Sequence, residues 1–247
     1  MIQALQWSAL VICGAVAVAR LPDAVRGRNR SIFGAFLLTT FAILLSIDAP
    51  YLAVDAWLGG ANYANLLLRF LVYGAVMFAG YRTAKAFGDA SGTRRITGPA
   101  GLAVLAGIAA VTTVTFLLAD TAGSSTGLTG LPLRSEANAQ LIGLYATAGR
   151  VYPAFVAVCL VPATLRAVGG RFPRALRTGA LLLSVGYAAM VASALYPLLP
   201  AGRAWCQSII SYAAVLGVSL GLTVIWLARL AATRRQARTG VRRASDA

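Results

Sequence analysis

Histidine is missing from this chain of 247 residues, lysine occurs once, at Lys85, and Asp and Glu together number seven. Without histidine, a zinc-protease site, a haem-histidine site and a histidine proton relay are all excluded. Only 12% of the residues are charged and 59% are hydrophobic, whereas an ordinary soluble domain has about 25% charged and about 45–50% apolar residues. So little polar surface cannot cover a soluble globule, and so apolar a chain does not stay disordered. The composition therefore predicts a polytopic membrane protein.

Cysteine is also scarce, with Cys13, Cys159 and Cys206 all in apolar segments. Their odd number and their spacing fit neither a disulfide framework nor a metal site, so we expect buried apolar thiols, no metal and no cofactor. The last apolar segment has no lysine for a retinal Schiff base, and no G-x-x-x-x-G-K-[ST] motif for nucleotide binding is present. No catalytic residue can be assigned, and we predict that the protein is not an enzyme.

Seven apolar runs have roughly the 20 residues that a helix needs to cross a hydrocarbon layer about 30 Å thick. Because backbone groups must pair internally within lipid, these runs are predicted to be helices. The predicted spans cover residues 2–19, 32–54, 64–81, 99–119, 138–165, 175–199 and 205–230. The predicted fold is thus an all-α, seven-span transmembrane helix bundle over residues 1–230, followed by a basic tail, residues 231–247, that we expect to be disordered.

The first segment has an alternative interpretation as a cleaved signal peptide, because an Ala-Val-Ala stretch precedes Arg20. A signal peptide begins with a basic region, and this chain begins Met-Ile-Gln-Ala. We therefore expect a retained helix.

Basic residues concentrate on one side of the predicted topology. Eighteen lie in the first, third and fifth connections and in the tail, whereas the other connections hold two, Arg134 and Arg203. Because segments rich in Arg and Lys stay in the cytoplasm, this split predicts an outside N-terminus and a cytoplasmic C-terminus in the plasma membrane of a bacterium. We therefore expect the excess positive charge, +15 in total, to interact with anionic lipid headgroups, and we expect no nucleic-acid partner.

Three ionisable residues, Asp48, Arg69 and Arg150, lie inside predicted spans, where a charge is costly and marks a candidate functional site. Counted from the inner boundary, they fall at about 27, 20 and 24 Å, which is within roughly one helical turn of a common depth. An ion pair of Asp48 with one arginine would lower the cost of burial and leave the other guanidinium for an anionic group. A purely structural role, in which the arginines snorkel or pair with Asp48 and backbone carbonyls, stays open.

Polar neighbours complete this predicted cluster in the outer half of the bundle. Asn65 shares a helix face with Arg69, four residues further on. Pro50 and Pro153 each follow one of the charges closely, and each leaves a carbonyl one turn earlier without its helix partner. The predicted ligand-binding or structural cluster consists of Asp48, Tyr51, Asn65, Arg69, Tyr145, Arg150 and Tyr152.

Three further segments carry predictions. Ala213, Gly217 and Gly221 recur every four residues in the last span, and small residues at that spacing permit close helix contact, within the bundle or between protomers. Residues 120–137 are rich in Gly, Ser and Thr, and we expect a flexible outer connector, with a lid over an outward-facing pocket as the alternative. Residues 88–98 are expected to form a solvated turn on the inner side.

The stretch Asn-Tyr-Ala-Asn-Leu-Leu-Leu-Arg-Phe, residues 62–70, follows a second span that ends in Asp-Ala-Pro-Tyr, residues 48–51. In these features the chain resembles a family of actinobacterial seven-helix integral membrane proteins that are loosely labelled transporters. The resemblance extends over roughly residues 1–235, through span order and loop charge, and concerns the N-terminal membrane domain of that family. It implies no catalytic residue.

Two functions agree with these features. The first is a sensory or regulatory membrane module that takes a small polar or anionic ligand at the polar cluster or binds a regulatory protein partner. The alternative is a small-solute transporter that uses the same cluster. A transporter needs access from both faces, and the inner half of the bundle offers only hydroxyls such as Thr39, Thr40 and Ser184. That shortage favours the sensory module, while the identity of the ligand and the oligomeric state do not follow from the sequence.

Overall fold

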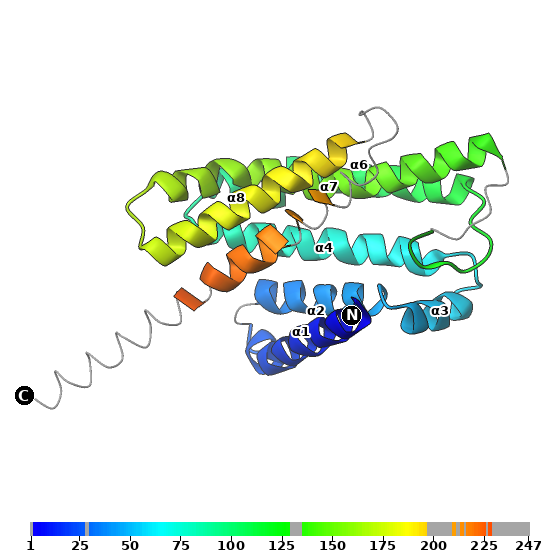
Figure 1. Cartoon of the computed structure of the whole chain (residues 1–247), viewed down its shortest axis with the longest axis horizontal. Coiled ribbons are helices and arrows are strands. Elements are labelled where there is room, and N and C mark those ends of the chain that lie inside the picture. The colour runs from blue at the N-terminus through cyan, green and yellow to red at the C-terminus, as the bar shows by residue number, and fades with distance from the viewer. Residues whose placement is uncertain are drawn as a thin grey trace, which may run out of the picture. The chain divides into compact units, whose positions relative to one another are not determined.

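The computed structural model describes residues 2–27, 30–128, 135–196, 209–210, 213–214, 216–225 and 227–228, and all regular elements within them are helical. The named helices are α1 (Ile2–Val25), α2 (Arg30–Leu44), α3 (Asp48–Trp57), α4 (Tyr63–Ala86), α5 (Ala90–Thr97), α6 (Pro99–Leu118), the 3-10 helix η1 (Thr126–Leu128), α7 (Glu136–Gly169) and α8 (Arg174–Leu195) (Figure 1). Two compact units divide the chain, Met1–Val156 and Ala157–Ala247, and α7 contributes to both.

Five of these helices, α1, α4, α6, α7 and α8, are long and apolar enough to cross a membrane, and α2 with α3 makes a sixth if the pair is one broken span. Large apolar side chains point outward along them, and Ile12, Val111 and Leu118 are each more than half exposed. Because a water-facing surface does not carry so much apolar cover, the coarse prediction of a multi-pass helical membrane protein is confirmed. The seventh predicted span, residues 205–230, is described only in part, and the predicted tail, residues 231–247, lies outside the described residues.

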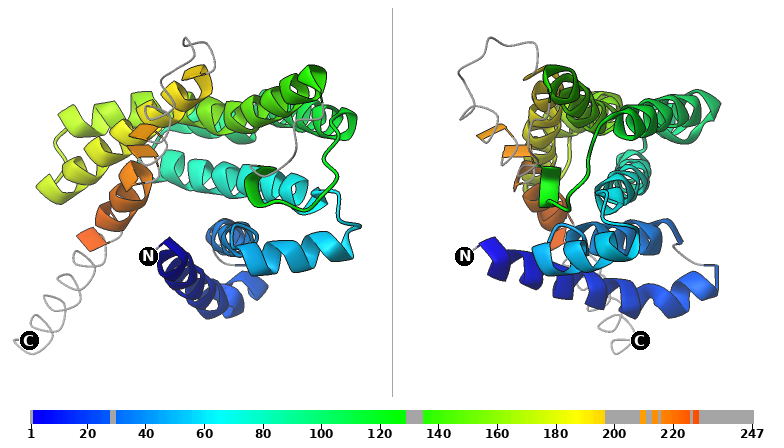
Figure 2. Two further views of the ribbon diagram at one scale, coloured as in Figure 1. Left: turned by 45° about the vertical axis from the view of Figure 1, so that its right-hand side comes forward. Right: turned by 90° about the vertical axis from the view of Figure 1, so that its right-hand side faces the viewer.

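The second predicted span, residues 32–54, is not one helix. The chain instead forms α2 and α3, which meet at an angle of 91°, so that α2 is viewed nearly along its axis in Figure 2 (left) while α3 runs across the picture. Pro50 lacks the N–H that would bond to the carbonyl of Ser46, and the Ser46 hydroxyl competes for the backbone by bonding to a carbonyl three residues earlier at 2.7 Å. The amides of Ser46 and Ile47 likewise reach back only three residues, at 2.9 and 3.2 Å. The helix therefore ends here, and α3 begins at Asp48 with the proline in its first turn.

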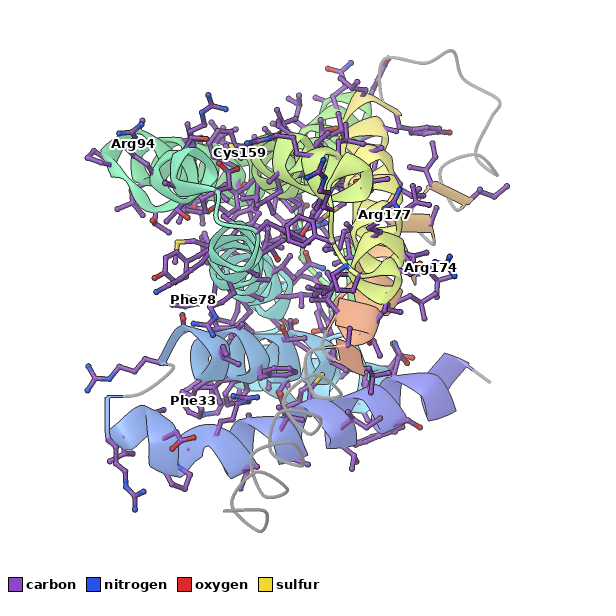
Figure 3. All side chains as sticks on the ribbon, turned by 90° about the vertical axis from the view of Figure 1, so that its left-hand side faces the viewer. Phe33, Phe78, Arg94, Cys159, Arg174 and Arg177 are labelled. Atoms are coloured by element: carbon purple, nitrogen blue, oxygen red, sulfur yellow. The ribbon has the colours of Figure 1, made fainter. Side chains whose placement is uncertain are left out.

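Helices α2 and α4 run antiparallel and approach closely at two glycines. A Cβ atom at Gly34 would lie 3.2 Å from the ring of Phe78, which Figure 3 labels on α4, and one at Gly74 would lie 2.6 Å from Leu38. Small residues at such points let two helix backbones come together. The antiparallel pairing brings the start of α2 and the end of α4 to one end of the first unit. We call it the basic end, and its basic residues are Arg26, Arg30, Arg82, Lys85, Arg94 and Arg95.

Residues 88–98 do not form the solvated turn that we predicted, because residues 90–97 fold into α5. The apolar Ile96 is fully buried, and this burial anchors the short helix. A Cβ atom at Gly101 would lie 2.1 Å from the carbonyl oxygen of Arg95, so only glycine permits this close junction between α5 and α6. Arg94 is exposed and points outward (Figure 3).

In the second unit, the glycine face of the last predicted span lies against α8 of the same chain. A Cβ atom at Gly217 would lie 2.7 Å from the Cα atom of Gly186, and one at Gly221 would lie 2.9 Å from the carbonyl oxygen of Gly179. Ala213, the third residue of the predicted packing face, is half-buried. The glycines therefore allow two helix backbones to touch, which is how helices associate in lipid without a hydrophobic driving force.

Candidate functional site

The first of two polar clusters in the first unit is built on the turn between α3 and α4. Asp55 is fully buried, and its carboxylate accepts hydrogen bonds from the amides of Asn62 at 3.0 Å and Ala64 at 3.1 Å. It also accepts a short hydrogen bond from the hydroxyl of Ser124. These amides belong to the N-terminus of α4, where N–H groups lack helix partners and the helix dipole favours a negative charge. The carboxylate is thus held by three donors.

Asn62 lies at the centre of this cluster, in a left-handed backbone conformation with φ of 60°. Its Nδ2 donates to the carbonyls of Thr121 at 2.7 Å and Gly123 at 2.8 Å. Its Oδ1 accepts from the hydroxyl of Tyr51 at 2.7 Å and the amide of Ser125 at 2.8 Å. The side chain therefore uses its full hydrogen-bonding capacity. We call this group the Asn62 clamp, and it consists of Tyr51, Asp55, Asn62, Thr121, Gly123, Ser124 and Ser125.

The clamp fastens the loop after α6, which we had expected to be a flexible connector over residues 120–137. Residues 120–128, which are described, are hydrogen-bonded to Asn62 on one side. On the other side, the Asn138 side chain bonds to the amide and the carbonyl of Asp120, at 2.7 and 3.1 Å. The loop is therefore tied to both α4 and α7. The sequence pattern missed this because Gly, Ser and Thr are typical of mobile loops but also supply the backbone and hydroxyl groups for such bonds.

The second cluster runs along facing sides of α4 and α7. On α4, Asn65, Arg69 and Tyr73 follow one another at intervals of four residues and so share one face. They meet α7 at Tyr145, Gly149 and Tyr152 in the same order, so the two helices run parallel at this contact. We call these six residues the α4–α7 seam.

Tyrosines dominate the interior of the first unit. The four largest fully buried side chains among the described residues are Tyr51, Tyr73, Tyr145 and Tyr152. In the seam, the Tyr145 hydroxyl donates to Oδ1 of Asn65 at 2.7 Å, and the rings of Tyr73 and Tyr152 meet edge to face with centroids 5.5 Å apart. Because the surrounding lipid is as apolar as leucine, such buried polar contacts hold helices together more specifically than apolar packing does.

Arg69 is the charged residue of the seam, and it packs against α7 where that helix has no side chain. A Cβ atom at Gly149 would lie 2.7 Å from Nη1, 2.8 Å from Cζ and 3.0 Å from Nε of Arg69, so glycine makes room for the guanidinium. The Cζ atom lies 5.3 Å from the centroid of the Tyr145 ring, a cation–π contact. Nε is buried without a hydrogen-bond partner, and no carboxylate pairs with Arg69 among the described residues. Pro153 cannot donate to the carbonyl of Gly149, four residues earlier, so an acceptor is left in this region as well.

The structure brings together part of the predicted cluster. Tyr51 belongs to the clamp. Arg150 is half-buried on α7, next to Gly149. Asp48 is exposed at the start of α3 and forms no ion pair with Arg69 or Arg150 within the described part of the chain, because the break between α2 and α3 carries it away. The predicted residues that meet in the seam are Asn65, Arg69, Tyr145 and Tyr152.

Several important residues were not singled out from the sequence. Asp55 is not part of the predicted cluster, although two glycines and Asn62 follow it within seven residues, a combination that is typical of a tight turn. Tyr73 continues the spacing of four that joins Asn65 to Arg69. Gly149 had no signal of its own, because the need for a glycine depends on which side chain faces it from α4.

Among the described residues, no group of three or more His, Cys, Asp or Glu side chains is placed to hold a metal ion. A comparison with known proteins finds no matching family model, no similar curated protein and no similar solved structure.

Proposed function

We propose that the chain is a non-enzymatic sensory or regulatory protein of a bacterial plasma membrane that binds a small polar or anionic solute at the α4–α7 seam. The observation that carries this proposal is Arg69, whose Nε is buried without a hydrogen-bond partner and which has no carboxylate partner in the described chain. An arginine inside a membrane span costs about 2.5–3.5 kcal/mol, and a structural arginine offsets this by pairing. The guanidinium lies against the Tyr145 ring and Gly149, and its planar set of donors matches a carboxylate or a phosphate.

The topology that we propose has seven spans, with the N-terminus outside and the C-terminus in the cytoplasm. The gathering of Arg30, Lys85 and Arg94 at the basic end supports it, since basic segments remain on the cytoplasmic side. Arg69 precedes Arg82 by 13 residues, which is about 20 Å along α4. In this topology the seam lies in the outer half of the membrane, where a solute outside the cell has the shorter path. The resemblance to the actinobacterial seven-helix family agrees with this topology and remains a prediction.

Binding can be tested on the purified full chain in lipid nanodiscs by the shift of its thermal unfolding midpoint with sodium acetate, sodium phosphate or, as a salt control, choline chloride. Ligands that bind only the folded state raise this midpoint with concentration. We expect acetate or phosphate to raise it well above the effect of choline chloride, and Arg69→Gln to remove the difference. Arg94→Gln, which changes an exposed arginine outside the seam, should keep it. An unchanged response in Arg69→Gln would contradict the proposal.

The alternative function, a small-solute transporter with the same cluster, is favoured by one observation on α7. Further along that helix, in the second unit, the buried hydroxyls of Thr164 and Ser184 are hydrogen-bonded at 2.9 Å. A transported polar solute needs polar side chains beyond its binding site, and these hydroxyls supply such groups further along α7. Uptake of labelled acetate or phosphate into vesicles distinguishes the two functions. Uptake that Arg69→Gln abolishes supports a transporter, whereas binding without uptake supports the sensory module.

A further inference from the structure

Helix α3 has a length and a direction that set it apart from the membrane-spanning helices. Its ten residues rise about 15 Å, which is too short to cross a hydrocarbon layer of about 30 Å. It meets α2 at 91°, so it runs across the direction in which α2 runs. A helix with these properties lies parallel to the membrane plane if α2 lies along the membrane normal.

The depth of α3 follows from the helix that precedes it. α2 starts at Arg30, at the basic end, and its 15 residues rise about 22 Å before the break at residues 45–47. The start of α3 is therefore close to the level at which a hydrocarbon layer of about 30 Å ends on the side opposite the basic end. At this level apolar acyl chains give way to headgroups, and tryptophan is enriched there.

A helix at this boundary needs one face packed on the protein and one apolar face toward the lipid, and the two faces of α3 differ in this way. The inner face carries Tyr51 and Asp55, both fully buried in the Asn62 clamp. The outer face is apolar: Leu52 is 44% exposed and Trp57 is 85% exposed, the highest value among the large hydrophobic side chains of the described residues. Asp48 is the one charged residue on that face, and it lies in the first turn. The remaining exposed residues of the face are Ala49, Ala53 and Ala56.

We propose that α3 is an in-plane helix whose outer face rests in the boundary between lipid headgroups and acyl chains, on the side opposite the basic end, with Trp57 as its anchor. A lipid surface fits this face better than a second copy of the chain does. A stable protein interface buries about 800 Å² on each partner, and a face of two large side chains and three alanines is smaller than that. The clamp holds the helix in place from the protein side, so the lipid meets a rigid apolar face.

The test uses a variant in which Trp57 is the only tryptophan, with Trp7, Trp205 and Trp226 replaced by phenylalanine, so that α3 itself is unaltered. The full chain is placed in phosphatidylcholine vesicles that carry bromine either near the headgroup end or near the methyl end of the acyl chains. We expect fluorescence emission at shorter wavelength than that of tryptophan in water. We also expect stronger quenching by the shallow bromine than by the deep one, and weak quenching by aqueous acrylamide.

A matched control moves the only tryptophan to position 111 of α6, whose valine is 54% exposed and lies about 18 Å along that helix from Pro99. Its emission should be quenched more strongly by the deep bromine. Emission of Trp57 like that of tryptophan in water, with strong acrylamide quenching, would overturn the proposal. So would a blue-shifted emission that neither bromine quenches, because protein rather than lipid would then cover the face. Neither result depends on whether the seam binds a solute, so this proposal and the proposed function fail separately.

Discussion

The Asn62 clamp and the α4–α7 seam are both polar and both attached to α4, yet they differ in how completely their buried polar atoms are hydrogen-bonded. In the clamp, Asp55 accepts three hydrogen bonds and Asn62 makes four. In the seam, Arg69 keeps a buried Nε that has no hydrogen-bond partner. Buried polar groups in folded proteins are nearly always hydrogen-bonded, so an exception requires a reason. The hydrogen bonds of the clamp satisfy both Asp55 and the Asn62 side chain, whereas the seam holds one buried donor, Nε of Arg69, that has no partner.

Loss of the clamp carboxylate should have the largest effect on stability. Asp55→Ala leaves two buried amides of the α4 N-terminus and the hydroxyl of Ser124 without their acceptor. We expect the free energy of unfolding to fall by about 3–5 kcal/mol, as for other broken buried networks. Asp55→Asn keeps one acceptor oxygen and the shape of the side chain, so its loss should be clearly smaller. Denaturant unfolding in nanodiscs measures both, and equal stability of Asp55→Ala and wild type would show that the clamp is not structural.

The central asparagine should come next. Asn62→Ala removes the side-chain bonds and also places a Cβ residue without polar help at φ of 60°. Asn62→Gly removes the same bonds but tolerates the left-handed backbone. We expect both variants to be destabilised, with alanine worse than glycine by about 1 kcal/mol. If the glycine variant is as stable as wild type, the side-chain bonds contribute nothing and the contrast with the seam disappears.

In the seam, filling the space under Arg69 should change binding more than stability. Gly149→Ala introduces a Cβ atom 2.7 Å from Nη1, which displaces the end of a flexible side chain. We expect this variant to lose the anion-dependent rise of the unfolding midpoint. Gly143→Ala is the matched control on the same helix, because a Cβ atom there has no neighbour within 4 Å. It should gain up to about 1 kcal/mol of stability from its helix propensity and keep the anion response. Equal anion responses in Gly149→Ala and Gly143→Ala would show that the anion does not bind at the seam.

The smallest effect is expected for Tyr145→Phe. This change removes the hydrogen bond to Asn65 but keeps the ring beneath the guanidinium of Arg69. We expect a loss of about 1 kcal/mol in the free energy of unfolding, typical of one hydrogen bond. Because the cation–π contact remains, the anion response should persist. Complete loss of that response would place the Tyr145 hydroxyl, rather than the guanidinium, at the centre of the site.

Much of the helical architecture could be predicted from the sequence, because length and apolar composition alone identify a helix that spans lipid. The predicted span over residues 99–119 agrees closely with α6 at Pro99–Leu118. The point at which a helix breaks within an apolar run was harder to predict. Residues 32–54 are predicted to form one continuous span, but Pro50 together with Ser46 ends the helix, and α2 and α3 meet at 91°.

The candidate site could be predicted only where its residues share one helix. Asn65 and Arg69 are four residues apart, so their common face follows from helical geometry. Their partners on α7 depend on the parallel register of two helices that are far apart in the sequence, and periodicity carries no information about that register. The clamp was missed for a related reason: Asp55 and Asn62 lie in a turn that looks like an ordinary connection until the loop after α6 folds onto it.

The parallel pairing of α4 with α7 has a consequence for biogenesis. Helix α4 leaves the ribosome well before α7, so the nascent chain must deliver Arg69 to the lipid before Tyr145 and Gly149 exist to receive it. Three consecutive leucines, Leu66, Leu67 and Leu68, directly precede the arginine and offset part of the cost of placing its charge in lipid. Each leucine favours membrane insertion by roughly 0.3–0.6 kcal/mol near the helix centre. We therefore expect these leucines to favour insertion of α4 at the stage when α7 has not yet been synthesised.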